Sequence, residues 1–252
     1  MPPFTHDSPP PNQTFQKRRQ ALVTGGTSGI GAAIARGLAD VQCDVLVTGL
    51  TDDEVRAFGS DGRTIRSMAL DITDAAAIRD VVDSFKRLDI LVNCAGTILR
   101  GGREHDPADF AHVIDVNLNG TMRMCSACRP LLAASRGCVL NIASMLSFFG
   151  SGHVPAYSAS KGGIVQLTKS LAIAWADDGI RVNALAPGWI ETPLTAPLVA
   201  NETRRQEIIA RTPLGRWGQP DDVAGAAVFL CSPAAAFITG AILPVDGGYS
   251  IA

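Results

Sequence analysis

Tyr157 and Lys161 stand four residues apart in the stretch YSASK, in a chain of 252 residues that contains only two tyrosines. On a helix, side chains at this spacing lie on one face, so both can reach the same reacting group. A phenol has a pKa of about 10, and a nearby ammonium group favours the phenolate. The pair therefore predicts a proton-transfer site in which Tyr157 is the acid or base and Lys161 lowers its pKa. The alternative is a solvent-exposed pair, the more common case when this spacing occurs alone.

A second stretch that could do chemistry is the glycine-rich TGGTSGIG, residues 24–31, which joins an apolar run to a helical pattern. Glycines allow a tight turn and a close approach of the backbone to a ligand. The free N–H groups and the partial positive charge at the start of the next helix suit a pyrophosphate. The stretch therefore predicts a dinucleotide-binding turn, and a purely structural turn is the alternative.

Both stretches belong to a chain in which apolar runs alternate with helical patterns. Runs rich in Val, Ile and Leu are each followed by apolar residues at helical spacing. This alternation is typical of βαβ units and a parallel sheet. We expect a single α/β domain of about seven strands over residues 20–252, with a long helix near 156–176 that carries Tyr157 and Lys161. The polar, proline-rich residues 1–19 are expected to form a disordered leader.

Composition excludes several classes of partner. The net charge is −2 and the isoelectric point is about 6.1. The chain therefore lacks the basic excess that nucleic-acid binding needs, and no nucleic-acid partner is expected. Residues 224–245 contain no charged residue, but Pro233 interrupts them. That pattern predicts a buried helix, a loop and a strand, so no membrane association is expected.

Six cysteines are scattered through apolar segments, and the N-terminal residues lack the apolar region of a secretory signal. The cysteines are expected to be reduced, buried thiols in a cytoplasmic protein. Cys125 and Cys128 form a C-x-x-C pair, but neither a second pair of ligands nor a thioredoxin-like context accompanies them. No metal site is therefore expected.

Four motifs together resemble the short-chain dehydrogenase/reductase family, in particular its bacterial branch of 3-oxoacyl-reductase-like and sugar-alcohol-dehydrogenase-like members. They are TGGTSGIG, NCAG at 93–96, YSASK with Ser144 thirteen residues before Tyr157, and APGWIETP at 186–193. The resemblance covers about residues 21–249. It implies a doubly wound, Rossmann-type sheet with helices on both faces, a nicotinamide dinucleotide (NAD or NADP), and hydride transfer between a secondary alcohol and a carbonyl group.

The resemblance also implies a catalytic group of four residues. Tyr157 would be the acid or base, and Lys161 would lower its pKa and bind the cofactor ribose. Ser144 would hydrogen-bond the substrate oxygen, and Asn117 would hold a water molecule that relays protons to the lysine. A catalytically silent dinucleotide-binding scaffold is the alternative function, and lyase or epimerase chemistry on the same fold is a third. The presence of both Tyr157 and Lys161 argues against the scaffold.

The cofactor contacts that the resemblance implies lie at the carboxyl ends of successive strands. The chain departs from the family at Cys94, where the second Asn of an N-N-A-G motif is usual, and a thiol cannot replace an amide as donor and acceptor. The expected cofactor-binding residues are Gly25, Thr27, Ser28, Gly29, Ile30, Gly31, Gly49, Leu50, Asp71, Ile72, Asn93, Ala95, Gly96, Tyr157, Lys161, Pro187, Gly188, Ile190 and Thr192.

The choice between NAD and NADP stays open, with a preference for NAD. A NAD-binding fold usually has a carboxylate at the end of strand two that bonds the ribose 2′-OH, and this chain has Gly49 there. Basic residues for the 2′-phosphate of NADP are missing too, because Leu50 and Ser28 stand at the usual positions. Asp52 and Asp53 follow closely and would repel a 2′-phosphate, which favours NAD.

The substrate side is expected to be apolar and to lie under a helical insert. Residues 189–212 are expected to act as a lid over cofactor and substrate. Candidate substrates are sugar or polyol derivatives, 3-oxoacyl thioesters, and cyclic or aromatic secondary alcohols. A homotetramer is expected by analogy, with the C-terminal strand near a two-fold axis. The expected pocket residues are Met145, Phe148, Phe149, Trp189 and Leu194.

Overall fold

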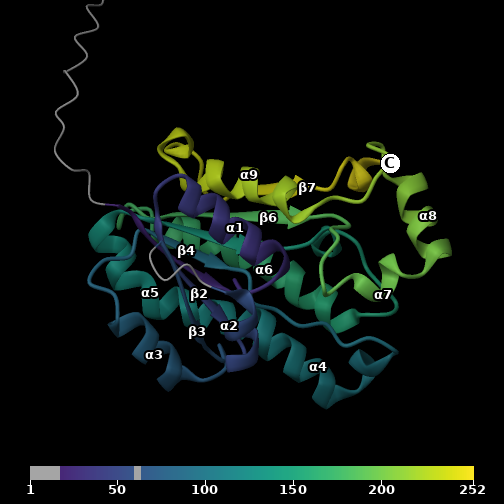
Figure 1. Ribbon diagram of the computed structural model, residues 1–252, viewed down its shortest axis with the longest axis horizontal. Helices are drawn as coiled ribbons and strands as arrows, with labels where there is room; N and C mark the ends of the chain where they lie inside the picture. Colours follow the sequence, from purple (N-terminus) through teal and green to yellow (C-terminus); the bar gives the residue numbers. More distant parts are fainter. Residues whose placement is uncertain (1–17, 60–63) are drawn as a thin grey trace, which may run out of the picture.

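The computed structural model of the protein describes residues 18–59 and 64–252, so residues 1–17 of the expected leader lie outside the described residues. Seven parallel strands form one sheet in the order β3-β2-β1-β4-β5-β6-β7 (Figure 1), which confirms the expected Rossmann-type α/β fold. The strands are β1 (Gln20–Thr24), β2 (Asp44–Gly49), β3 (Ile65–Ala69), β4 (Ile90–Asn93), β5 (Cys138–Ile142), β6 (Arg181–Pro187) and β7 (Ile242–Val245).

Helices cover both faces of the sheet, as a doubly wound fold requires (Figure 1). On one face lie α1 (Gly29–Asp40) and α9 (Pro220–Cys231), whose buried residues share a core with the strands. A second core on the other face lies under α3 (Ala75–Asp83), α5 (Thr121–Ser135) and the end of α6 (Pro155–Ala174). The remaining α-helices are α2 (Asp52–Phe58), α4 (Pro107–Ile114), α7 (Ala196–Val199) and α8 (Glu202–Arg211).

The two cores follow from the alternation of side chains along each strand. In β1, Ala21 and Val23 belong to the core under α1 and α9, whereas Leu22 belongs to the core on the opposite face. All three side chains are fully buried. Successive side chains of a strand point to opposite faces, so a central strand covered on both faces must be apolar throughout. Replacing Leu22 with Ala would cost about 2–5 kcal/mol of stability.

Two segments show where helices are interrupted or end. Between α4 and α5 lies η2 (Asp115–Gly120), a turn of π-helix that no sequence pattern indicated. The uncharged residues 224–245 form most of α9, the short 3₁₀ turn η4 (Pro233–Ala235) and β7, so Pro233 follows the helix end as expected. Over residues 18–59 and 64–252, no helix combines the length and the apolar character needed to cross a membrane.

Several residues outside the site have structural roles. Arg18 and Arg19, the last residues of the expected leader, make contacts within the fold: Arg18 pairs with Asp44, and Arg19 donates a 2.6 Å hydrogen bond to the carbonyl of Cys231. The C-x-x-C pair lies inside the core on α5, and burial raises the pKa of both thiols, that of Cys125 to about 12. The described residues hold no cluster of three or more metal-ligating side chains.

The strand order places a crevice at the carboxyl ends of β1 and β4. The chain proceeds outward from β1 to β2 and β3, then returns to add β4 on the other side of β1. Ligands of open α/β sheets bind at such a switch point, because the loops that follow the two strands run in opposite directions. This end of the sheet is therefore where the chemistry-bearing motifs should meet.

Candidate active site

The glycine-rich turn after β1 forms one wall of the crevice. Gly25 and Gly29 have positive φ values of 62° and 50°, a region that favours glycine. A Cβ at Gly31 would lie 2.2 Å from the carbonyl oxygen of Gly25. A Cβ at Gly25 would lie 2.7 Å from the backbone of Ala95, at the end of β4. Close backbone approach therefore requires these glycines and leaves a cradle of main-chain atoms.

The N-terminus of α1 faces the same turn. Ser28 is its N-cap residue, but the Ser28 hydroxyl makes no capping hydrogen bond, and the first turn of the helix carries no acidic residue. The N–H groups and the positive end of the helix dipole are therefore available to an anion such as a pyrophosphate. The loop after β6 reaches this point too, because a Cβ at Gly29 would lie 3.2 Å from the side chain of Thr192.

Thr24, the last residue of β1, holds the NCAG segment in place. Its hydroxyl accepts hydrogen bonds from the N–H groups of Cys94 and Ala95, both at 3.2 Å. The backbone of this segment is thus fixed by Thr24, which explains why a thiol at position 94 is compatible with the turn. Burial raises the pKa of the Cys94 thiol to about 11, so the thiol is neutral at neutral pH.

The side chain of Asn93 lies in the interior and not in the crevice. Its amide nitrogen donates to Asn141 at 2.9 Å and to the sulfur of Cys125 at 3.2 Å, and only 4% of the residue is exposed. The side chain of Asn93 therefore holds β4 to β5, so the predicted cofactor contact of this residue would have to come from its backbone. The side chain of Ile190 is likewise buried, in the core under α1 and α9.

The carboxyl end of β2 holds a carboxylate that no motif revealed. Glu54, in the first turn of α2, accepts a 2.7 Å hydrogen bond from the N–H of Leu50. A Cβ at Gly49 would lie 3.0 Å from that carboxylate oxygen and 2.8 Å from the Thr27 hydroxyl. Glu54 therefore lies beside Gly49, where NAD-binding folds usually present an acidic side chain from the strand itself.

The end of β3 and the loop after β6 complete the rim. Asp71 is exposed and accepts a 2.8 Å hydrogen bond from the N–H of Thr73. Ile72 is buried against Gly120, where a Cβ would lie 2.7 Å from the Ile72 side chain. Pro187 ends β6, and the next residue, Gly188, donates from its N–H to Val245 at 3.0 Å.

Tyr157 and Lys161 share one face of α6, as the spacing predicted. The Lys161 ammonium nitrogen lies 5.7 Å from the centre of the Tyr157 ring and donates a 2.6 Å hydrogen bond to the carbonyl of Ile142. Ser144, two residues after β5, lies near the phenol of Tyr157 and lowers its pKa. The Ser144 hydroxyl also accepts from the N–H of Leu146 at 3.1 Å, which fixes its orientation.

Asn117 lies in the π-helical turn η2 and connects three segments of the site. Its side chain accepts from the N–H of Thr97 at 2.7 Å and donates to the carbonyl of Thr97 at 2.9 Å. It also donates to the Ser160 hydroxyl at 3.0 Å, directly beside Lys161. A Cβ at Gly96 would lie 3.2 Å from the Asn117 oxygen and 3.8 Å from the Lys161 nitrogen. Asn117 therefore ties the β4 loop to α6 next to the ammonium group.

The electrostatics of this group differ from the sequence-based expectation. Burial raises the pKa of Tyr157 to about 12, and the nearby Ser144 hydroxyl only partly offsets that effect. Burial also lowers the pKa of Lys161 to about 8. Desolvation of the phenolate therefore dominates the pKa of Tyr157, and the lowering of that pKa by Lys161 stays a prediction. At neutral pH the phenol is protonated and the amine largely charged.

Comparisons with known proteins agree with this geometry. The family model described as enoyl-(acyl carrier protein) reductase matches residues 25–250. The chain is 44% identical to 2-dehydro-3-deoxy-D-gluconate 5-dehydrogenase of Bacillus subtilis, over 92% of this chain and 95% of that protein. It is 41% identical to cis-4-hydroxycyclohexanecarboxylate dehydrogenase of Sinomonas cyclohexanicum, over 92% and 96%.

The chain belongs to the short-chain dehydrogenase/reductase family. It falls in the sugar-alcohol-dehydrogenase-like branch and is an NAD(P)-dependent oxidoreductase that acts on secondary alcohols. A solved structure agrees: gluconate 5-dehydrogenase of Burkholderia cenocepacia, in complex with NADP and tartrate, superposes with a TM-score of 0.86 at 36% identity, covering 93% of this chain and 96% of that chain. The backbone cradle at Gly25 and Gly31 and the uncapped N-terminus of α1 fit a dinucleotide.

Near Tyr157 lies a cation that sequence reasoning missed. The Arg100 guanidinium donates a 3.0 Å hydrogen bond to the carbonyl of Leu194, in the segment before α7. Arg100 also lowers the pKa of Tyr157, because its positive charge acts on the phenol. The sequence NCAGTILR contains an indication of Arg100, because this residue follows the NCAG turn by four positions and therefore lies on the loop after β4.

Expected pocket residues divide into two groups. Met145 is buried, whereas Phe148 is 50% exposed and Leu194 is 44% exposed. The guanidinium carbon of Arg211 lies 5.7 Å from the centre of the Phe149 ring. The ring of Trp189 contacts Trp217 and Tyr249 at centroid distances of 5.7 and 6.2 Å, beside a cavity of about 200 Å³ near the C-terminus. Arg211 joins the two groups, because its guanidinium carbon also lies 4.2 Å from the centre of the Tyr249 ring.

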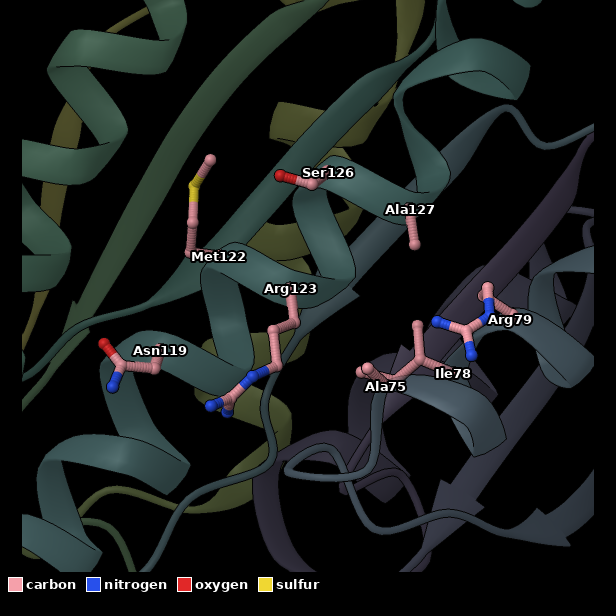
Figure 2. Close-up of a pocket in the computed structure, with 8 residues that line it drawn as sticks. All are labelled: Ala75, Ile78, Arg79, Asn119, Met122, Arg123, Ser126 and Ala127. Atoms are coloured by element: carbon pink, nitrogen blue, oxygen red, sulfur yellow. The ribbon is translucent and has the colours of Figure 1, made fainter.

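A larger cavity lies outside the site. It has a volume of about 550 Å³ and lies between α3 and α5, where Figure 2 shows its lining side chains. Arg123 on its rim is paired with Asp115 at 2.6 Å. None of its lining residues belongs to the glycine turn or to the Tyr157 group, so it is a surface groove between helices and not the dinucleotide crevice.

Proposed function

We propose that Tyr157, Lys161, Ser144 and Asn117 form the catalytic group of this dehydrogenase. A bound nicotinamide dinucleotide supplies or accepts the hydride. In the reducing direction, the protonated Tyr157 gives its proton to the substrate oxygen, which the Ser144 hydroxyl orients. In the oxidising direction Tyr157 takes the alcohol proton, and the positive charge of Lys161 stabilises the phenolate. The convergence of Tyr157, Ser144 and Lys161 beside the glycine turn supports this proposal.

Turnover and dinucleotide binding together test the catalytic group. Purified protein is expected to change the absorbance of a nicotinamide cofactor with secondary hydroxy acids or their keto forms. Tyr157→Phe should lower kcat by about 10³-fold, the range of a lost general acid, while the dinucleotide Kd stays within about twofold. A wild-type protein that binds dinucleotide but turns over no substrate would favour the silent scaffold. Full activity of Tyr157→Phe would exclude the assigned acid.

The substrate is proposed to be a secondary alcohol that carries a carboxylate. Arg100 supports this: among the described residues its one hydrogen bond goes to Leu194, so its guanidinium can bind a carboxylate beside Tyr157. The two relatives named above act on a deoxygluconate derivative and on a hydroxycyclohexanecarboxylate, and both names specify a carboxylate. Residues 189–212 would cover such a substrate as a lid, with the Arg100 contact to Leu194 at its edge.

Matched substrates separate this class from neutral alcohols. Gluconate-type acids should be oxidised with a kcat/KM at least about tenfold above that of their amides or parent polyols, because only the acids pair with Arg100. If kcat/KM is the same for the acid and its amide, the enzyme does not recognise the carboxylate. That result would not affect the proposal for the catalytic group.

The cofactor is proposed to be NAD, with Glu54 as the residue that selects it. A carboxylate held beside Gly49 can accept a hydrogen bond from the ribose 2′-OH and repels a 2′-phosphate. The structural relative from Burkholderia cenocepacia is in complex with NADP, so the preference needs its own measurement. Titration of the free protein with NAD and NADP should give the lower Kd for NAD. A lower Kd for NADP would refute the proposal.

The assembly is proposed to be a homotetramer. Strand β7 lies at the edge of the sheet, with Leu243 38% exposed, and the neighbouring Phe237 is fully exposed. An edge strand flanked by apolar side chains is suited to pairing with a second copy across a two-fold axis. Light scattering during gel filtration should give four times the chain mass. A monomer would contradict the proposal, and Phe237→Glu should weaken the assembly.

The compartment is proposed to be the cytoplasm. All six cysteines lie in the described part of the chain and none is paired in a disulfide, which suits a reducing environment. Fractionation of cells that express the protein at native levels would test this assignment. Recovery of the protein in a secreted or periplasmic fraction would contradict it.

A further inference from the structure

Glu104 is a fully buried carboxylate beside the proposed active site. It lies in the 3₁₀ turn η1 (Arg103–His105) and has no exposed surface. A buried ion destabilises a fold unless specific partners compensate for its lost hydration. Its two oxygens have such partners: one accepts from the N–H of Leu99 and the other from the N–H of Tyr157, both at 2.9 Å.

The contact with Tyr157 supplies a missing helix cap. Val154 is the N-cap residue of α6 and its side chain makes no capping hydrogen bond. Tyr157 is the third residue of that helix, where an N-cap side chain would normally accept the N–H. Glu104 takes this place from 53 residues earlier in the chain, and its negative charge also suits the positive end of a helix of 20 residues.

The contact with Leu99 fixes the loop that carries Arg100. Leu99 directly precedes Arg100, whose guanidinium reaches Leu194. One carboxylate therefore joins the backbone of the proposed acid to the loop of the proposed carboxylate-binding residue. We propose that Glu104 is a positioning residue that holds Tyr157 and Arg100 at a fixed separation through these two backbone hydrogen bonds. The inference rests on the function proposed above for those two residues.

The charge of Glu104 has a second consequence at the phenol. The polar and charged groups around Tyr157 are Ser144, Cys94, Arg100 and Glu104, together with Lys161 on the same helix. Arg100 lowers the pKa of Tyr157 and Glu104 raises it, because the two charges are opposite in sign. Removing the negative charge therefore makes the phenol easier to deprotonate, and alcohol oxidation should reach its plateau at a lower pH.

Two substitutions separate the effect of the Glu104 side-chain length from the effect of its charge. Glu104→Gln keeps the length but replaces one acceptor oxygen with an NH₂ group, so it should lower kcat/KM about tenfold. It should also move the rising limb of the oxidation pH profile down by about half a pH unit or more. Glu104→Asp keeps the charge but cannot span both amides, so it should lower kcat/KM without moving the limb downward. The dinucleotide Kd should stay within about twofold in both variants.

Asp109→Asn is the matched control. It removes one negative charge five residues away, from a carboxylate that pairs with Arg103 at 2.9 Å and does not contact Tyr157. Its pH profile and kcat/KM should match those of the wild type. Thermal melts of all variants identify any that do not fold. If Glu104→Gln does not fold, the loss of kcat/KM in Glu104→Asp decides the test.

Specific outcomes would overturn the inference. If folded Glu104→Gln has the pH profile and kcat/KM of the wild type, or if Glu104→Asp retains full kcat/KM, Glu104 does not position these groups. A rate loss in Glu104→Gln with an unmoved pH limb would make it a stabilising residue only. If Tyr157→Phe is fully active, the catalytic proposal itself fails, and that result is distinguishable because it does not depend on Glu104.

Discussion

The proposed dinucleotide side of the crevice and its proposed substrate side are built by different means. The dinucleotide side consists of backbone: Gly25, Gly29 and Gly31 lie within seven residues, and their geometry comes from one tight turn. The substrate side consists of side chains that reach across the fold. Arg100 contacts a residue 94 positions away, and Glu104 contacts one 53 positions away.

The two sides should therefore tolerate substitution differently. A Cβ at Gly25 or Gly31 collides with main-chain atoms, so the backbone cradle tolerates few changes at these positions. Side chains such as Arg100 can be exchanged without disturbing the strands that hold them. One fold can therefore keep its cofactor and change its substrate, as the differing names of the relatives illustrate.

The largest expected effect is at the backbone cradle. Gly31→Ala would place a Cβ 2.2 Å from the carbonyl of Gly25, so the turn must shift. The free energy of unfolding should fall by about 3 kcal/mol, and dinucleotide affinity should fall about 100-fold. Calorimetric melts and dinucleotide titration measure the two effects.

Gly225→Ala provides the contrast. Gly225 lies within α9, and a Cβ there would meet nothing within 4 Å. This substitution should raise stability by up to about 1 kcal/mol, because alanine is the better helix former. If Gly31→Ala behaved like Gly225→Ala, the cradle would be more tolerant than its geometry implies.

The same contrast decides how much the sequence alone could predict. The alternation of strands and helices, the glycine turn and the Tyr157–Lys161 pair depend on local spacing, and the structure has each where the spacing placed it. The π-helical turn that directs Asn117 toward Ser160 was not visible in the pattern. Such a turn depends on contacts with α6 and not on propensity.

Glu54, Arg100 and Glu104 escaped prediction for one physical reason. Each contacts a partner that only the fold, or the start of a helix, brings close. In a sequence, an acidic or basic residue in a loop is usually a solvated charge, so none of the three stood out. The raised pKa of Tyr157 escaped prediction for a similar reason, since the spacing to Lys161 was visible but the burial of both groups was not. Burial is a property of the folded chain.

Lys161 lies where the two sides of the crevice meet. The burial of its ammonium group should lower the free energy of unfolding. Its pKa falls from an ordinary 10.5 to about 8, so between these values the unfolded chain binds more protons than the folded one. Stability should therefore rise as the pH increases from about 8 to 10. Lys161→Met should remove this rise, stabilise the protein at pH 7 by about 3 kcal/mol, and abolish turnover.

Lys169→Met is the matched control for this measurement. Lys169 is exposed on the same helix, so its substitution should leave the pH dependence of the melting temperature unchanged. If Lys161→Met and Lys169→Met had the same stability at pH 7, the buried ammonium would carry no cost.

Arg100 tests the substrate side without touching the cradle. Arg100→Gln should raise KM for a hydroxy-acid substrate about 30-fold, the loss of a charged hydrogen bond, and leave the dinucleotide Kd unchanged. KM for a neutral alcohol substrate should change little. Steady-state kinetics with an acid and its amide give both numbers, and an equal rise for the two substrates would assign Arg100 to loop structure.

The smallest expected effect lies at Glu54, where a side chain modifies the backbone cradle. Glu54→Gln keeps an acceptor for the ribose 2′-OH but removes the charge that repels a 2′-phosphate, so the ratio of the Kd for NADP to that for NAD should fall about tenfold. Asp52→Asn removes a charge from the same helix turn without contacting Leu50, and it should change the ratio by less than about twofold. Equal changes in the two variants would mean that the summed charge of α2 acts on the cofactor, and the contact beside Gly49 would lose its special role.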